Sequence, residues 1–412
     1  MGGEVPFTHY AEVNPKRHLR RGEEYPFVEM AALPEGGGEL RYLGRRIFDG
    51  QGSRFAVGDT LFARITPCTE NGKASIVRKL DGFDVGFGST EFIVLAARDG
   101  ACPEFVYQVA VSPEVRRRAV SRMLGTSGRQ RVPTSFFEEE LRLPAFAASE
   151  QHGIGAVLRA IDEAIEQTEA VIAATEAVRK ALLLELLTRG VPGWHTEWKT
   201  VPGVGTIPAC WEVVRLGDCV RDSVYGPRFP ADRYDPSGNV ATLRTTDLND
   251  EGEINLDSMP LARLDLRPFE SFLLAPEDLV ITRSGSCGVA AVFEGHDVPV
   301  LPGAFLIRLR CREGSNPRYL KLWLNSAPGR EATGRIQAGG VQKNINAENL
   351  KRVELAMPKP AEQSRILELA SEIRHRELRD IHVLRFLRDL KAELADALLS
   401  GRVRVPMGGW PK

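Results

Sequence analysis

Apolar residues recur at helical spacing through one long stretch of the chain, from Glu150 to Arg189. Beyond Gly155 this stretch contains no glycine and no proline, and its Ala, Leu, Glu and Ile residues favour a helix. About 40 residues of helix would be roughly 60 Å long. The pattern predicts a long spacer helix over residues 150–190 whose apolar stripe packs on a partner helix. The stripe consists of Ile154, Leu158, Ile161, Ile165, Ile172, Leu182 and Leu186, with Thr168 and Thr175 as weaker members.

A second stretch, from Glu362 to Ser400, repeats the first at a constant offset of 212 residues. A shared heptad pattern would explain the matching apolar positions. It would not explain why the Glu-Gln pair that opens the first stretch returns at Glu362 and Gln363, or why both stretches end in Leu-Leu-Thr/Ser. We therefore infer an internal duplication and a second spacer helix over residues 362–401.

The remaining chain forms two segments that match one another, residues 1–149 and 205–361. Both contain short alternating strands, glycine turns and one stretch of helical spacing, so we predict an α+β fold with two mixed α/β domains. The offsets between matching segments stay between 212 and 219. The matches are Tyr25–Leu33 with Val240–Leu248, Gly58–Arg64 with Glu277–Arg283, Pro103–Val111 with Pro317–Asn325, and Ser127–Val132 with Gly339–Asn344.

The order of segments also predicts how they are arranged. Only Gly190 to about Pro208 links the first helix to the second domain, and this linker opens with the helix-ending sequence Gly-Val-Pro-Gly. To bury its stripe on the first helix, the second must run back antiparallel to it. We therefore expect a coiled-coil spacer with the two domains at opposite ends, related by a pseudo-twofold axis.

Composition indicates an ordinary globular chain. The six cysteines form no CxxC pair and none lies in ligand spacing with the seven histidines, so neither a disulfide framework nor a zinc site is expected. No apolar run is long enough to cross a membrane, and the expected location is the reducing cytoplasm. Net charge is −1, but Ser112 to Val132 holds six arginines against one acid, and Lys16 to Arg21 reads KRHLRR. Taken alone, either run is more often a solvated surface than a nucleic-acid contact.

Motifs for bond-making chemistry are not evident. The chain has no GxxxxGK[ST] loop, and it lacks the Asn/Asp-Pro-Pro-aromatic tetrad of DNA-amino methyltransferases. Glu197-Trp198-Lys199 has nuclease-like spacing but lies in the linker. His152, His375 and His382 are best interpreted as helix-surface residues. Triads such as Ser-His-Asp or Cys-His are assembled in space, so spacing alone does not exclude them.

Several phrases together resemble the specificity subunit of type I restriction-modification enzymes, over nearly the whole chain. They are GDTLFARITPCTENGKA (58–74), GSTEF (88–92), the GxQ loops at 128–130 and 340–342, the Glu-Gln helix openings and IPACWEVVRLGDCV (207–220). The first segment departs from the pattern because it lacks the Trp-Glu-Val-x-x-Leu-Gly-Asp opening of Trp211 to Asp218. It also departs at Pro144 to Ser149, which replaces the usual proline-rich lead into the helix.

The resemblance implies a non-catalytic, sequence-specific DNA reader. Residues 1–149 and 205–361 would be target-recognition domains that each read one half of a bipartite target in double-stranded DNA. Residues 150–190 and 362–401 would set the gap between the halves. Two methyltransferase (M) subunits, and motor-nuclease (R) subunits in the full complex, would be the partners. S-adenosylmethionine, ATP and Mg²⁺ would be bound by those partners.

Basic and amide side chains at matching positions are the candidates for DNA contact, because arginine suits guanine and asparagine or glutamine suits adenine. Arg64 and Arg283 end matched strands and could instead brace the fold through a carboxylate. For Asn71 the Asn-Gly turn is itself a sufficient explanation. The candidates are Arg64, Asn71, Lys73, Arg129, Gln130 and Arg131 in the first domain, and Arg244, Arg283, Arg335, Gln342, Lys343 and Asn344 in the second.

Two further matters stay open at the level of sequence. The run Ala181 to Leu187 is apolar nearly all round, so it either docks methyltransferase helices or is buried under its own recognition domain. Two rival functions are a stand-alone DNA-modifying enzyme and a coiled-coil scaffold without a DNA role. Methyl transfer by the chain alone would support the first rival, and absence of salt-dependent DNA binding would support the second.

Overall fold

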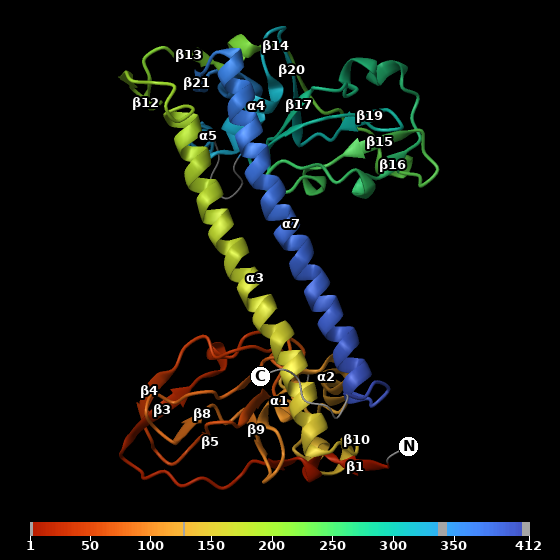
Figure 1. Ribbon diagram of the computed structural model, residues 1–412. Helices are drawn as coiled ribbons and strands as arrows, with labels where there is room; N and C mark the ends of the chain where they lie inside the picture. The colour runs from red at the N-terminus through yellow and green to blue at the C-terminus, as the bar shows by residue number, and fades with distance from the viewer. Residues whose placement is uncertain (1–2, 127, 337–343, 406–412) are drawn as a thin grey trace. The chain divides into compact units, whose positions relative to one another are not determined.

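The computed structural model describes residues 3–126, 128–336 and 344–405, and its contacts divide the chain into two compact units. The first unit contains residues 1–172 and 380–412, and the second contains residues 173–379. The division falls inside both long helices, α3 (Ala148–Thr188) and α7 (Pro360–Leu399), so each unit includes part of each helix. Figure 1 shows both as continuous helices. The predicted mixture of helix and strand in two units is confirmed.

Both long helices end at a glycine with left-handed backbone geometry. Gly190 has φ +81° and Gly401 has φ +72°, the conformation that closes a helix at its C-terminal side. α7 begins with Pro360, whose fixed φ suits the first position of a helix. Each helix begins two residues before its predicted first residue and ends two residues before its predicted last residue.

Within each unit the two helix segments run antiparallel. In the first unit Asp162 of α3 forms an ion pair with Lys391 of α7, and Glu169 of α3 forms one with Arg388 of α7 at 2.6 Å. Residue numbers therefore rise along α3 in the direction in which they fall along α7. In the second unit Arg179 lies 3.0 Å from Glu377. The predicted antiparallel pairing is confirmed within each unit. The predicted placement of the two domains at opposite ends of a rod stays a prediction.

The first unit contains two four-stranded sheets. One is fully antiparallel, with strand order β2-β9-β6-β7, and the other has order β4-β3-β8-β5 with β3 and β8 parallel. Helices α1 (Pro103–Val111) and α2 (Pro113–Ser121) follow β9. The strands are β2 (Ala11–Val13), β3 (Glu24–Val28), β4 (Gly44–Ile47), β5 (Ser53–Ala56), β6 (Thr60–Ala63), β7 (Ala74–Ile76), β8 (Val85–Gly88) and β9 (Phe92–Ala97).

The second unit repeats this topology with fewer strands. Its antiparallel sheet has order β14-β20-β17-β18, and its smaller sheet has order β16-β15-β19 with β15 and β19 parallel. The strands are β14 (Val220–Tyr225), β15 (Val240–Leu243), β16 (Leu261–Ala262), β17 (Leu279–Thr282), β18 (Ala290–Val292), β19 (Val300–Pro302) and β20 (Leu306–Cys311). Its helices are α4 (Pro317–Asn325), α5 (Ala327–Arg335) and α6 (Ala347–Lys351).

The helical spacing seen after Pro103 resolves into two helices rather than one. Pro113 cannot continue α1 because it lacks a backbone N–H, and Ser112 caps α2 by accepting from the Val115 N–H at 3.3 Å. The linker before the second domain also has structure of its own. β11 (Trp198–Val201) and β12 (Gly205–Pro208) form a hairpin there.

The N-terminal edge of the first unit is built like that of the second, although its sequence opening differs. β1 (Glu4–Pro6) pairs with β10 (Arg142–Pro144), and β13 (Glu212–Arg215) pairs with β21 (Glu354–Met357), both antiparallel. The N–H that follows each strand donates to an equivalent carbonyl at 2.8 Å, Phe7 to Leu141 and Leu216 to Val353. The missing Trp-Glu-Val motif therefore leaves this edge unchanged.

Each unit has its own core, into which the ends of the long helices are packed. Ile154 and Leu158 of α3 and Leu398 of α7 are buried in the largest cluster of the first unit. Leu187 of α3 and Ile366 of α7 are buried in that of the second. In the part of the chain that the structure describes, no helix is both long enough and apolar enough to span a bilayer.

Candidate nucleic-acid interface

The first candidate site lies where strand β6 ends, at a meeting of three segments that we call the Arg64 junction. The backbone N–H of Arg64 donates to the carbonyl of Glu91 at 3.0 Å, and its carbonyl accepts from the Val132 N–H at 2.8 Å. Two residues further on, the Thr66 N–H donates to the Gln130 carbonyl at 3.0 Å. The end of β6 is thus held between the turn before β9 and the segment that follows α2.

The second unit forms the same meeting of segments at the end of β17, the Arg283 junction. The N–H of Arg283 donates to the Phe305 carbonyl at 2.9 Å, and its carbonyl accepts from the Ile345 N–H at 3.0 Å. Ser284 and Asn344 form an isolated antiparallel bridge next to it. The two arginines therefore occupy equivalent backbone positions, as the internal repeat predicts.

Neither of these arginines uses its guanidinium to brace the fold through a carboxylate. Among the described residues, Arg64 and Arg283 form no salt bridge, and the Nε of each is buried without a hydrogen-bond partner. Arg283 instead lies over the ring of Tyr225, 4.5 Å from its centroid. A half-exposed guanidinium without a carboxylate partner retains donors for an acceptor supplied by a ligand.

A glycine-containing loop adjoins the Arg64 junction. Leu124 and Arg131 exchange both backbone hydrogen bonds at 2.9 Å and close the loop between them. Gly125 has φ +126°, and a side chain there would place its Cβ 2.8 Å from the Arg129 carbonyl oxygen, so only glycine fits. The loop presents Arg129 exposed and Gln130 half exposed.

Arg131 is held by an ion pair within the first unit. Its Nε lies 3.0 and 2.9 Å from the two Glu91 carboxylate oxygens, and its Nη2 lies 2.6 Å from Oε1. These hydrogen bonds lower the pKa of Glu91 and raise the pKa of Arg131. Arg131 therefore fixes the junction and is less available than Arg64. Glu91 was not predicted as a site residue, although it belongs to the Gly88–Phe92 motif.

Two candidates of the second unit are also engaged by neighbours. The Arg244 guanidinium donates to both carboxylate oxygens of buried Asp247, at 2.7 and 3.1 Å, and to the Ser258 carbonyl at 2.8 Å. The hydrogen bonds that Arg244 donates to Asp247 raise the pKa of Arg244. Arg335, exposed in the last turn of α5, donates to Glu331 at 2.7 Å and to the Gly203 carbonyl at 3.2 Å.

The remaining candidates divide between the junctions and other places. Asn71 is exposed, and its amide donates to Glu35 Oε1 at 3.0 Å. The Lys73 carbonyl accepts from Ala63, the residue immediately before Arg64, at 3.0 Å. Asn344 is exposed at the Arg283 junction. Gln342 and Lys343 lie outside the described residues.

Aromatic residues at the Arg283 junction were not identified from the sequence. Phe305 is 55% exposed and Tyr225 is 39% exposed. The Tyr225 hydroxyl accepts from the Ala347 N–H at 2.9 Å, which fixes the ring under Arg283. The run Tyr225-Gly-Pro-Arg228, where an aromatic and a basic residue stand close together, was the available signal. Within the described ranges, no group of three His, Cys, Asp or Glu side chains is placed to hold a metal ion.

The apolar run at the end of α3 has two environments. Leu186 and Leu187 are buried in the core of the second unit, as one of the two sequence interpretations expects. Leu183 and Leu184 instead line a groove of about 990 Å³ in the second unit, together with Leu322 of α4 and Leu367 of α7. Leu184 is 47% exposed there. Burial under the recognition domain and an open apolar surface are therefore both present, on different residues.

Residues 208–374 match the model of the type I restriction modification DNA specificity domain. The chain is 33% identical over 136 residues to the EcoAI specificity subunit of Escherichia coli. It is 34% identical over 141 residues to the EcoEI specificity subunit of the same organism. Each alignment covers 32% of this chain and 23% of the relative.

Solved structures share the fold over almost the whole chain. A chain from a study of complex assembly and conformational transition in a type I R-M system has a TM-score of 0.61 at 19% identity and covers 98% of each chain. The type I restriction-modification S subunit from M. genitalium has a TM-score of 0.55 at 13% identity and covers 96% of each chain. Residues 208–374, which contain the Arg283 junction, match the type I restriction modification DNA specificity domain, and the resemblance to type I specificity subunits indicated by the sequence is confirmed.

Proposed function

We propose that this chain is a DNA-specificity subunit that reads a bipartite target, one half with each unit. The observation that carries the proposal is the equivalence of Arg64 and Arg283. Each follows the same strand of a repeated sheet, each is held by the same pair of backbone hydrogen bonds, and neither guanidinium pairs with a carboxylate of the described residues. Two equivalent, chemically available arginines suit a protein that binds two patches of duplex.

Each junction would combine a fork-shaped donor with amide side chains. Arginine can donate to guanine O6 and N7, and glutamine or asparagine can pair with adenine N6 and N7, each bidentate pair contributing roughly 1–3 kcal/mol of discrimination. Arg64, Arg129 and Gln130 would serve the first half-site in this way. Arg283 and Asn344 would serve the second, where exposed Phe305 adds an apolar surface suited to a thymine methyl group.

Basic residues already engaged by a carboxylate would have a different role. Arg131 and Arg244 each keep a bidentate carboxylate partner, so they would position the recognition loops and contribute positive potential near phosphates. Arg335 and Lys73 would contact the backbone of the duplex. Such contacts give affinity that falls steeply with salt and carries no sequence information.

The chemistry on DNA would belong to partner subunits. Methyltransferase and motor-nuclease subunits would bring S-adenosylmethionine, ATP and Mg²⁺, and this chain would supply only recognition. The groove lined by Leu183, Leu184 and Leu367 offers an apolar strip with charged borders, a surface on which a methyltransferase helix could pack.

Single substitutions at the two junctions test the proposal. The chain is co-expressed with its methyltransferase, and methylated sites are mapped by sequencing. Arg64→Ala should relax or abolish one half-site, and Arg283→Ala should relax the other. Arg267→Ala, an exposed arginine paired with Asp265 at 2.6 Å, is the control and should leave both halves unchanged. Loss of both halves in either junction variant, with a normally folded protein, would contradict independent readers.

The role of the two helices as a spacer is a separate part of the proposal. Inserting one helical turn into both α3 and α7 should lengthen the unspecified gap of the methylated sequence and leave the two halves as they are. Exchanging residues 1–149 for another recognition domain should change one half only. A chain–methyltransferase complex without salt-dependent DNA binding would instead favour a scaffold.

A further inference from the structure

Three side chains of the second unit, from three separate segments, line up as thiol, imidazole and carboxylate. The Cys210 Sγ lies 3.5 Å from His195 Nδ1, and His195 Nε2 lies 2.6 Å from Glu362 Oε1. Cys210 follows strand β12, His195 follows helix α3, and Glu362 stands in the first turn of α7. Distant residues thus form an arrangement that their sequence spacing does not disclose.

The carboxylate that ends this line is fixed in place. Glu362 Oε1 also accepts from the Val191 N–H at 3.1 Å, and its Oε2 accepts from Trp211 Nε1 at 2.8 Å. Its side chain is only 6% exposed, and that of His195 is 9% exposed. The carboxylate and the imidazole are therefore held in one geometry, which is the condition for a directed proton transfer.

The orientation of the ring follows from these contacts. A carboxylate oxygen can only accept a hydrogen bond. His195 Nε2 therefore carries a proton and donates a hydrogen bond to Glu362. Nδ1 then faces the Cys210 sulfur, and the pair shares one proton between them. When that proton lies on Nδ1, the sulfur is a thiolate beside an imidazolium whose charge Glu362 balances. This is how protein thiols are made nucleophilic.

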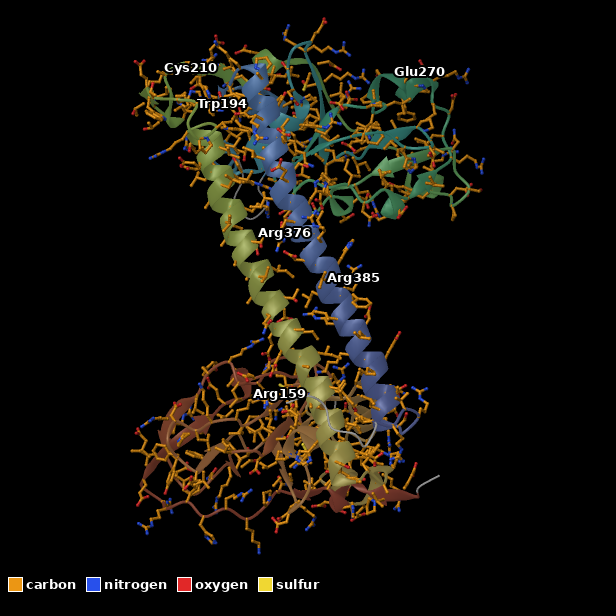
Figure 2. All side chains as sticks on the ribbon, viewed as in Figure 1. Arg159, Trp194, Cys210, Glu270, Arg376 and Arg385 are labelled. Carbon is orange, nitrogen blue, oxygen red and sulfur yellow. The ribbon has the colours of Figure 1, made fainter. Side chains whose placement is uncertain are left out.

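Cys210 is also the cysteine that solvent can reach. It is the one exposed residue among the six cysteines; Cys102 and Cys219 are buried, and Cys68, Cys287 and Cys311 are half buried. Burial raises the pKa of the Cys102 and Cys219 thiols, and that of Cys311 to about 11. Figure 2 shows Cys210 at the periphery of the second unit.

We propose that Cys210 is an activated thiol and the site at which small disulfides and soft electrophiles modify this protein. With a low-molecular-weight disulfide, the Cys210 thiolate attacks one sulfur and a mixed disulfide forms as the original S–S bond breaks. The departing thiolate takes the proton held by His195. Sulfur oxidation states balance because the reagent disulfide is reduced as Cys210 is oxidised.

Alkylation of the full-length chain with iodoacetamide, mapped by peptide mass spectrometry, tests the proposal. Cys210 should react first, at least about 10-fold faster than N-acetylcysteine methyl ester under the same conditions. A matched control is Thr206→Cys in a Cys210→Ser background, because Thr206 is exposed on the same hairpin and faces Thr200 across it. The thiol of this control should react at the rate of the free reference compound.

Variants of the imidazole separate activation from simple exposure. His195→Ala should slow the alkylation of Cys210 about 10-fold while leaving it exposed to solvent. Thermal unfolding checks that this variant still folds. If it does not fold, the comparison of wild-type Cys210 with the Thr206→Cys control decides alone. A Cys210 rate equal to that of the control, or one unchanged by His195→Ala in a folded protein, would overturn the proposal.

Discussion

Gln151 and Gln363 make the same hydrogen bond in two different units. Each side-chain amide donates to the backbone carbonyl five residues earlier, Gln151 to Phe146 at 3.1 Å and Gln363 to Pro358 at 2.9 Å. Both side chains are buried, with 5% exposure. A donor at this position satisfies a carbonyl of the incoming segment and fixes the angle at which that segment enters the helix. The repeated Glu-Gln opening is therefore a structural joint between each domain and its helix.

Removing the first joint should destabilise the first unit. Gln151 Oε1 also accepts from the Cys102 N–H at 3.1 Å, so Gln151→Ala leaves a buried donor and a buried acceptor unpaired. We expect a loss of about 1–3 kcal/mol in unfolding free energy. Urea denaturation measures it, with Gln167→Ala as control, because Gln167 is exposed on the same helix. The control should change stability by less than about 0.5 kcal/mol. Equal effects of the two substitutions would show that the joint has no stabilising role.

Features that repeat in the sequence were predictable, because a pattern seen in one half of the duplicated chain supports the same interpretation of its counterpart in the other half. The two long helices, their glycine ends and the matched strands that precede Arg64 and Arg283 follow from spacing, propensity and constant offsets. Pro113 also indicated the break between α1 and α2, but the helical spacing of apolar residues continues across it, so the sequence pattern alone suggested one helix. Local patterns therefore located the elements better than their boundaries.

Partners of charged side chains could not be predicted, because they depend on pairings distant in sequence. Arg131 meets Glu91 across 40 residues, and Arg308 of β20 meets Asp222 across 86. Arginine in a matched motif looks the same in the sequence whether it is available, like Arg64, or occupied, like Arg244. The Cys210, His195 and Glu362 line is a further case, since only folding brings these three residues together.

Gly190 is required both for its backbone conformation and for the lack of space for a side chain, and Gly193 allows the two effects to be separated. Its φ is +81°, and a Cβ there would lie 2.5 Å from Glu362 Oε1 and 2.6 Å from His195 Nε2. Gly193 has φ +83° with nothing near the position of a Cβ. Gly193→Ala should therefore cost only the backbone strain, about 1–2 kcal/mol. Gly190→Ala should cost clearly more, because the buried hydrogen bond between His195 and Glu362 must also move. Thermal unfolding of both variants measures the difference, and similar values would mean that the close approach is relieved cheaply.

Glu377 balances two arginines in the second unit. Its Oε2 lies 3.0 Å from Arg179 Nε and 2.9 Å from Arg374 Nη1, and its side chain is 6% exposed. Glu377→Gln removes the charge that holds the two cations together. The expected loss is about 2 kcal/mol, less than the roughly 3–5 kcal/mol of a fully buried pair, because Arg374 keeps Glu251 and is partly hydrated. Glu372→Gln, an exposed change on the same helix, is the control. A loss that is no larger than in the control would show that Glu251 and Glu253 suffice to hold the two arginines.

The ion pair between Glu91 and Arg131 should make the stability of the first unit depend on pH in the acidic range. Hydrogen bonds from Arg131 hold the pKa of Glu91 below its usual value, so the folded state favours the ionised carboxylate. That contribution is complete above the unfolded-state pKa, about 4.3, and is lost as pH falls through the lower folded-state pKa. The stability difference between wild type and Glu91→Gln should be constant near neutral pH and should shrink below about pH 4.3.

Urea denaturation midpoints at a series of pH values measure this difference. Glu138→Gln is the control, because Glu138 is exposed and forms no ion pair with the residues that the structure describes. Its curve should run parallel to that of the wild type throughout. If the stability difference between wild type and Glu91→Gln stays constant into the acidic range, the ionised carboxylate of Glu91 contributes no stability through Arg131. Arg131 would then be as available as Arg64 for an acceptor on DNA, and its assignment as a positioning residue would have to be withdrawn.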